Sequence, residues 1–451
     1  MSARWTIGEQ AFDRLEPGTS RRSGRGIADL LLLLAVIALM TLSDYALEFF
    51  GIPYISLGGS IVTKIHPATY LIVAALALAV IANPNPVVYT LDLLARCLGS
   101  TCLLVACLLM WVFISRYKPD YAASFLIDTL IAAALLFFLF ADAGERTRLI
   151  IARVVHVIMV ANCLLSIFEG ISGWRLFPFV VGGVEQTWEY RATALLGHPL
   201  AGALITGVYA VILMTVRDVR GLSERWRGPI VLLCLAAMPF IGSRTSFAVV
   251  FATATVVTGL GFLRFLRGNS VDVYKLLAVM TLVPLGIAVL AILFQTGLFD
   301  NFIERFMNDK GSAESRVRLF DLFDDFTLQD FLVGQTLGAL DTNVRLNGLT
   351  QGIENSWVGH LVRYGIVTSA VLWFGVAAWF TDMLRAAGRG AILPLTFVFL
   401  VISTTTGISA KISMLTIPAV LILALVARGS EEKLPAAESD RLSRAGVRSR
   451  T

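Results

Sequence analysis

Charged residues are scarce in this sequence. Of its 451 residues only 15% are charged while 57% are hydrophobic, and the mean hydropathy is +0.76. Soluble domains carry about a quarter charged residues, so the composition excludes an ordinary soluble protein. Apolar runs close to the length of a bilayer span recur from end to end. We therefore expect an integral membrane protein.

Cysteine is also rare. The five cysteines all fall in apolar segments, with no C-x-x-C pair and no histidine next to them. This pattern indicates buried, inert thiols rather than a disulfide framework or a metal site. The net charge of +5 reports orientation in a membrane rather than nucleic-acid binding. We expect no metal, no cofactor and no nucleic-acid partner.

About twelve apolar runs predict an all-α polytopic membrane protein. The runs are 27–47, 67–82, 98–115, 122–141, 149–169, 193–216, 229–241, 245–263, 275–296, 356–380, 391–408 and 412–427. The first is long for a signal-peptide core and has no small-residue cleavage pattern behind it, so it is kept as a span. The sequence shows neither an internal repeat nor the paired Gly/Pro-broken helices of transporters.

The distribution of basic residues supports this order of spans. With both termini in the cytoplasm, the inside segments hold roughly two thirds of the 37 Lys and Arg residues, as the positive-inside rule requires. The expected organisation is a disordered cytoplasmic tail (1–26), helices 1–9 (27–296), a large periplasmic loop (297–354), helices 10–12 (355–428) and a second cytoplasmic tail (429–451).

The long external loop carries an amphipathic pattern. Between Ser315 and Phe326, aromatics at 320, 323 and 326 alternate with acids at 321, 324 and 325. This predicts a helix in the membrane interface with its acidic side toward water. Arg316 and Arg318 open this helix, and surface ion pairs with nearby acids are the alternative explanation for both arginines.

A charged residue is costly within a span: at the centre it costs about 2.5–3.5 kcal/mol on insertion scales. A charge within or at the edge of a span is therefore a candidate functional group. Arg244 follows Gly242-Ser243, where two short apolar stretches meet on the external side. Its rigid five-donor fork suits a phosphate or pyrophosphate. A snorkelling arginine that anchors a helix end is the alternative.

A second external cluster runs from Arg191 to Pro199. It stands where a span enters the membrane, and Gly197 and Pro199 predict a broken helix start that exposes backbone groups. His198 within it is a candidate functional group, although a lone histidine near a span end is more often structural.

The long loop gives way to an apolar run at Glu354. Asn355 or Ser356 is a good N-cap for the helix that follows. Glu354 then lies at the water interface near the positive end of the helix dipole, ionised and able to accept a proton. His360 is about 600° further around the helix and shares a face with Arg363, which predicts a structural pair. Glu354 is therefore the better chemical candidate.

These residues resemble a known family, the O-antigen ligase and Wzy-type polysaccharide polymerase superfamily, including its exopolysaccharide members. Four features carry the likeness in the expected order: the small-residue, Gly-x-Pro entrance from Arg191 to Pro199; the helix start Gly242-Ser243-Arg244; Ser315-Arg316 with Leu319-Phe320 and Phe331-Leu332-Val333-Gly334; and Asn355 followed by Gly365. The likeness covers about residues 190–370. Glu354 stands where the family has a histidine that is implicated as the base.

The resemblance implies a GT-C-like fold and a metal-independent glycosyltransferase in the bacterial inner membrane. Its substrate would be an undecaprenyl-pyrophosphate-linked oligosaccharide on the periplasmic face. Arg244 and Arg316 would neutralise the departing pyrophosphate, Glu354 would orient or deprotonate the acceptor hydroxyl, and Asn355 would hold the sugar. Further residues expected at the same cavity are Arg191, His198 and Arg318.

Several alternatives stay open. A ligase differs from a polymerase only in its acceptor, and no residue decides between them. A transporter or flippase for the same lipid-linked sugar would need polar residues through the bundle core, for which Asp128 and His156 are the few candidates. A non-catalytic subunit of a polysaccharide export machine is the third alternative; other export proteins are possible partners of an enzyme too.

Overall fold

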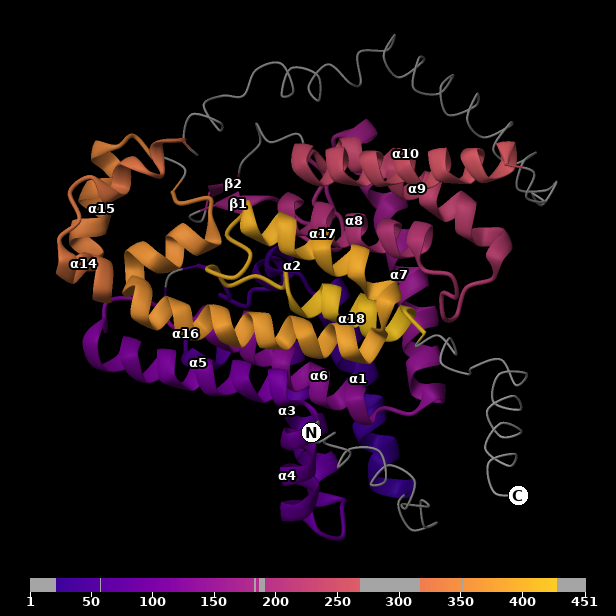
Figure 1. Ribbon diagram of the computed structural model, residues 1–451, viewed down its shortest axis with the longest axis horizontal. Coiled ribbons are helices and arrows are strands. Elements are labelled where there is room, and N and C mark those ends of the chain that lie inside the picture. The colour runs from indigo at the N-terminus through magenta and orange to yellow at the C-terminus, as the bar shows by residue number, and fades with distance from the viewer. Residues whose placement is uncertain are drawn as a thin grey trace, which may run out of the picture.

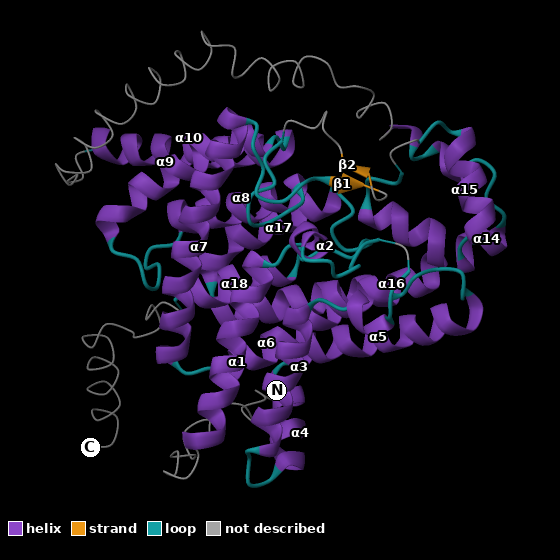
Figure 2. Ribbon diagram, turned by 180° about the vertical axis from the view of Figure 1, so that it is seen from behind, coloured by secondary structure: helices purple, strands orange, loops and turns teal. Residues whose placement is uncertain are grey.

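The computed structural model describes residues 22–56, 58–181, 184–185, 191–267, 317–349 and 352–427. The described chain is almost entirely helical (Figures 1 and 2). Its helices are α1 Arg22–Thr41, α2 Asp44–Phe49, α3 Pro67–Ile81, α4 Pro86–Arg96, α5 Leu98–Tyr117, α6 Ala132–Asp142, α7 Glu145–Ser172, α8 Pro199–Thr215, α9 Glu224–Ile241, α10 Arg244–Leu266, α14 Leu328–Val333, α15 Leu337–Leu346, α16 Ser356–Ala387, α17 Ile392–Ser403 and α18 Thr416–Leu425. Two short strands, β1 Val180–Val181 and β2 Val184–Glu185, pair antiparallel.

The all-α class is confirmed, and each predicted apolar run within the described residues contains a helix. The run 275–296 lies outside them. Three described helices are long and apolar enough to cross a membrane, namely α5, α7 and α16, and five shorter apolar helices of 10–17 residues accompany them. These features indicate a membrane protein.

The boundaries differ from expectation in three places. Helix α1 begins at Arg22, inside the segment expected to be a disordered tail. The run 27–47 is divided where Ser43 caps α2 by accepting a hydrogen bond from Ala46 N (3.3 Å). A helix that the hydropathy map did not predict, α4, begins with Pro86 behind the capping side chain of Asn85.

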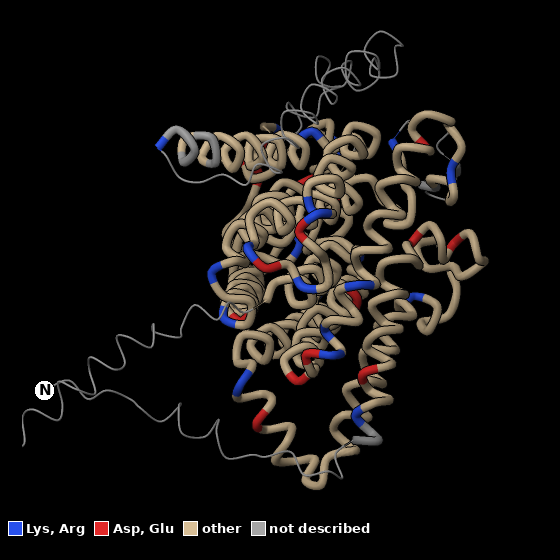
Figure 3. Tube along the Cα trace, turned by 90° about the vertical axis from the view of Figure 1, so that its right-hand side faces the viewer, with Lys and Arg blue, Asp and Glu red and all other residues tan. Residues whose placement is uncertain are grey.

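Helices α8 and α18 form the centre of the bundle. Nearly all their residues are buried, as expected for helices that are apolar on every side. The peripheral helices expose large apolar side chains, such as Leu108 of α5 and Phe374 of α16. Figure 3 shows long stretches of helix without Lys, Arg, Asp or Glu. Such apolar outer surfaces are suited to contact with lipid.

Helices α5 and α16 lie side by side in Figure 1. Small residues allow this close approach: a Cβ on Gly99 would collide with the carbonyl of Ala378, and one on Gly375 would lie 2.8 Å from Ala106 Cβ. At one end of the pair, Asp382 Oδ2 accepts a hydrogen bond from Ser100 N (2.8 Å), near the start of α5.

Five connections meet at the other end of this pair, which we call the loop end: the described residues of 42–66, 118–125, 173–198, 317–355 and 404–415. Contacts join them in a chain: Lys411 Nζ donates to the carbonyl of Tyr54 (2.9 Å), Ser356 Oγ to Thr405 (2.7 Å) and Lys118 Nζ to Gln335 (2.9 Å), while the rings of Tyr45 and His198 stack at 6.4 Å. Helices α14 and α15 lie at this end, and α14 packs against α16 (Figure 1).

A second group of connections meets at the opposite end. Arg220 N donates to the carbonyl of Leu425 (2.9 Å), and the Arg220 guanidinium pairs with Glu145 (3.1 Å). Arg25 pairs with Asp142 (3.1 Å). The predicted alternation of spans requires connections at two opposite ends of the bundle. These contacts hold the second group together at the end opposite the loop end.

An interlocked pair of glycines joins the long loop to α16. Gly334 (φ +78°) follows α14, and Gly365 (φ +72°) interrupts α16 with a non-helical turn. A Cβ on Gly334 would collide with the backbone of Arg363, and one on Gly365 with the backbone of Leu332. Between them Gln335 N donates to the Val362 carbonyl (2.9 Å). We call this contact the glycine clasp; it kinks a helix that the sequence predicted as continuous.

Substituting either clasp glycine should therefore release the loop from α16. We expect Gly334→Ala and Gly365→Ala each to lower the unfolding free energy by at least about 1–2 kcal/mol, because a left-handed conformation and a backbone collision act together. The measurement is the thermal midpoint of the purified protein in detergent. Gly338→Ala in α15 is the matched control, since no atom lies within 4 Å of a Cβ there; equal midpoints for all three variants would contradict the clasp.

Candidate functional site

The start of α16 is fixed by two side chains. Asn355 is its N-cap, and Asn355 Oδ1 accepts hydrogen bonds from Trp357 N (2.9 Å) and Val358 N (3.1 Å). The sequence predicted this cap at Asn355 or Ser356. Ser356 is fully buried and instead binds the 404–415 connection, donating to the carbonyl of Thr405 and accepting from Ile408 N (3.1 Å). The helix start is therefore held rigidly at the loop end.

Glu354 lies directly before this cap. It is half-buried, and its carboxylate has no hydrogen bond or ion pair with any residue that the structure describes. The carboxylate is therefore available to a ligand. His360, by contrast, is completely buried in the bundle, with the rings of Phe125 and Tyr364 at 5.8 and 6.2 Å. Its expected orientation away from Glu354 agrees with this burial.

The Arg191 and Arg244 regions lie together. Gly242 (φ +76°) ends α9 in a left-handed conformation, and Arg244 is the first residue of α10, as the predicted break requires. Two residues before Gly242, the carbonyl of Phe240 accepts a hydrogen bond from Ala192 N (2.9 Å). Arg191 and Arg244 are both half-buried. Two arginines that are 53 positions apart in sequence thus belong to one part of the loop end.

The backbone N–H groups just before α8 already have hydrogen-bond acceptors within the protein. Glu169 Oε2 accepts from Thr193 N and Ala194 N (both 2.9 Å), and Asn162 Oδ1 accepts from Leu195 N (3.1 Å). Both acceptors come from α7, and both are buried. The sequence predicted the exposed backbone groups but not their partners. An anion would have to displace Glu169 to use these N–H groups.

His198 has a capping role at the loop end. Its Nδ1 accepts from Leu200 N (3.2 Å), with Pro199 as the first residue of α8. His66 does the same at α3, where Nδ1 accepts from Ala68 N (3.1 Å) before Pro67. The repeated His-Pro pair was a readable signal for two similar helix starts. A substrate contact from His198 stays a prediction.

The predictions for the rest of the long loop are tested only in part. Arg316 lies outside the described residues. Arg318 is exposed, and its Nη1 approaches Gly348 at the end of α15. From residue 317 onward the expected interfacial helix consists of short turns, with a 3-10 turn at Asp321–Phe323, before Thr327 and Asp330 form the capping box of α14.

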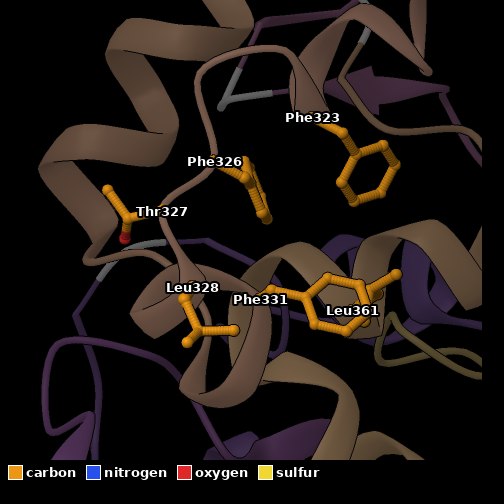
Figure 4. Close-up of a pocket in the computed structure, with 6 residues that line it drawn as sticks. All are labelled: Phe323, Phe326, Thr327, Leu328, Phe331 and Leu361. Carbon is orange, nitrogen blue, oxygen red and sulfur yellow. The ribbon is translucent and has the colours of Figure 1, made fainter.

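Phe323 and Phe326 of this segment, with Phe331 of α14, line an apolar pocket of about 540 Å³ against Leu361 of α16 (Figure 4). Phe323 and Phe326 contact each other edge to face, with ring centroids 5.0 Å apart. Asp321, Asp324 and Asp325 are exposed. The predicted division into an aromatic side and an acidic side holds for Phe323 and Phe326 but not for Phe320, which is 67% exposed, and the backbone is not one continuous helix.

Asp128 is a buried acid with several hydrogen bonds. Its carboxylate accepts hydrogen bonds from Tyr54 Oη (2.8 Å), Thr69 Oγ1 (2.7 Å) and His66 N (3.2 Å), and it lies in a π-helical turn, Leu126–Ile131. Lys411 Nζ lies 3.3 Å from the centroid of the Tyr54 ring. Both oxygens of Asp128 have partners, so the carboxylate joins its own turn to the 42–66 connection and to the first turn of α3.

The ring nitrogens of His156 have hydrogen-bond partners as well. Its ring nitrogens contact Tyr209 Oη (2.7 Å) and the carbonyl of Arg220 (3.0 Å). The two polar groups on which a transporter function would depend are thus both engaged by the protein itself. Within the part of the chain that the structure describes, no cluster of His, Cys, Asp or Glu could hold a metal ion, and the five cysteines are free.

Comparison with known proteins adds no family assignment. No protein-family model matches this chain, and no curated protein matches it. The residues and their geometry therefore carry the functional argument.

The capping role of Asn355 can be measured. Asn355→Ala removes both acceptor contacts and should lower the unfolding free energy by about 1 kcal/mol, whereas Asn355→Asp retains an acceptor and should keep the stability close to that of the unmodified protein. Thermal midpoints in detergent test this. An Asp variant as unstable as the Ala variant would show that the amide does more than cap.

Lys411 provides a pH-dependent test of the loop end. Burial lowers the pKa of Lys411 to about 8, against the opposing attraction of Asp128. Because this pKa lies below the ordinary value, the cost to stability is complete below about pH 8 and disappears as the pH rises toward 10.5. Acetylation of the amine, followed by mass spectrometry between pH 6 and 11, should show a midpoint near 8. A midpoint near 10.5 would mean that the amine is solvated.

Proposed function

We propose that this protein is a polysaccharide polymerase of the bacterial inner membrane, which joins undecaprenyl-pyrophosphate-linked repeat units. The proposal assigns the loop end to the periplasmic face and both termini to the cytoplasm, in keeping with the positive-inside distribution of Lys and Arg. About twelve spans would then complete a GT-C-like fold. Other polysaccharide export proteins would be its partners.

The observation that carries the proposal is the contact between motif regions far apart in sequence. The Arg191 region meets the Arg244 region through the Ala192–Phe240 hydrogen bond, and the Gly334 motif meets Gly365 in the glycine clasp. These are the features by which the sequence resembles the ligase and polymerase superfamily. Their gathering at the end of the bundle that also holds Glu354, a half-buried carboxylate without a partner among the described residues, is the arrangement that a shared reaction site requires.

The reaction would be a displacement at the anomeric carbon of the donor sugar. The acceptor hydroxyl oxygen forms a bond to that carbon while the bond to the pyrophosphate oxygen breaks, and the electron pair leaves with the pyrophosphate. Glu354 takes the hydroxyl proton, and Arg244 with Arg316 offsets the negative charge that develops on the leaving group. The configuration inverts, and no metal is needed in this scheme.

Two variants test the mechanism. Glu354→Gln and Arg244→Ala should abolish long polymer and accumulate single repeat units on the lipid carrier, with protein level and insertion unchanged. Gel analysis of extracted glycans measures the chain length. Asp325→Asn, which changes an exposed acid of the same loop, is the matched control. Normal chain length from both variants would refute the assignment.

The glycan that accumulates on deletion separates polymerase from ligase. Single repeats on the carrier identify a polymerase, and complete polymer left on the carrier identifies a ligase. If deletion leaves the lipid-linked glycan on the periplasmic side unchanged, the protein is neither a polymerase nor a ligase.

A further inference from the structure

Helix α4 turns an apolar face away from the protein. Val87, Val88 and Leu91 are 68%, 59% and 61% exposed, and Ala95 is exposed as well. At about 100° per residue, these four side chains share one side of the helix. Figures 1 and 2 show α4 projecting from the body of the bundle. We call these four residues the α4 face.

The opposite side of α4 is polar and is attached to the protein. Tyr89 Oη donates to Asp142 Oδ2 at the end of α6 (3.0 Å). Arg96 pairs through Nε with Asp92 (2.8 Å), and its Nη2 lies 4.0 Å from Asp142. Leu93 is buried on the same side. A helix at the surface of a soluble protein has the reverse arrangement, with its apolar stripe toward the core and its polar side toward water.

The surface around the α4 face indicates what covers it. Exposed apolar side chains continue before α4 in Leu78 and Ile81 of α3, and after it in Leu98 and Val105 of α5. Helix α5 is long and apolar enough to cross a membrane. The α4 face is therefore continuous with a surface that suits lipid. A stable protein partner would need about 20–30 residues a side, far more than the four that this face offers.

We propose that α4 is an interfacial helix, with the α4 face inserted into the lipid leaflet at the end of the bundle opposite the loop end. Amphipathic helices of this kind lie in the plane of the interface with the apolar side about 5–10 Å into the headgroup and acyl boundary. Because Asp142 also pairs with Arg25 of α1, the depth of α4 fixes the depth of α1 and α6. The inference needs a membrane but no glycosyl transfer.

Nitroxide labels on α4 provide the test, in the full-length protein reconstituted into phosphatidylcholine nanodiscs. Leu91→Cys is labelled, and power-saturation EPR measures its collisions with oxygen, which concentrates in the bilayer, and with a water-soluble nickel chelate. The ratio of oxygen to nickel collisions should be severalfold higher than at a labelled Ser223→Cys. The label on Leu91→Cys should lie about 5–10 Å below the phosphates.

Ser223 is the matched control because it is exposed at the same end of the bundle and its side chain makes no capping hydrogen bond. The unsubstituted protein measures any label on the native cysteines, four of which are buried. If Leu91→Cys is unstable, Val87→Cys carries the same comparison on the same face.

Two results would overturn the inference. One is a collision ratio at Leu91→Cys equal to that at Ser223→Cys, which would show that water covers the α4 face. The other is spin–spin broadening at Leu91→Cys in discs that hold two copies, absent from discs that hold one, which would assign the face to a second copy of this chain.

Discussion

The contact between Gly334 and Gly365 determines the shape of the loop end. Two backbone segments approach so closely that neither residue can carry a side chain, and both take a left-handed conformation that glycine adopts at little cost. Lys118 strengthens the contact by donating to the carbonyl of Gly334 (2.6 Å). The long loop is thereby attached to α16 two turns beyond its start, and Glu354 lies directly before the N-cap of that helix.

Polar side chains in the described interior mostly stabilise backbone that a helix bundle leaves open. Glu169 and Asn162 accept from the broken start of α8, and Asp128 accepts from the start of α3. In a membrane these acceptors matter more than in water, because an unsatisfied N–H cannot turn to solvent. Some buried polar atoms of the described residues depart from this rule, among them Thr206 Oγ1 in α8 and Ser369 Oγ and Trp379 Nε1 in the later turns of α16.

The chemistry proposed for this end divides between two kinds of group. Arginines on separate segments would bind the pyrophosphate, and one carboxylate would accept the proton of the acceptor. Holding them on rigid helix starts limits reorganisation during the reaction, which is the main benefit of a preorganised electrostatic site. Asn355 and Ser356 contribute by fixing the backbone on which Glu354 depends.

The sequence by itself determined the membrane class, the order of the helices and the breaks at Gly242, Pro199 and Asn355. These features depend on local composition, left-handed glycine and capping, which act within a few residues. Only the tertiary structure decided that Gly334 meets Gly365, that Glu169 occupies the backbone at the start of α8, and that Arg363 turns back toward Gly359. Each of these depends on which segments pack together, and residues far apart in the chain carry no local signal of their meeting.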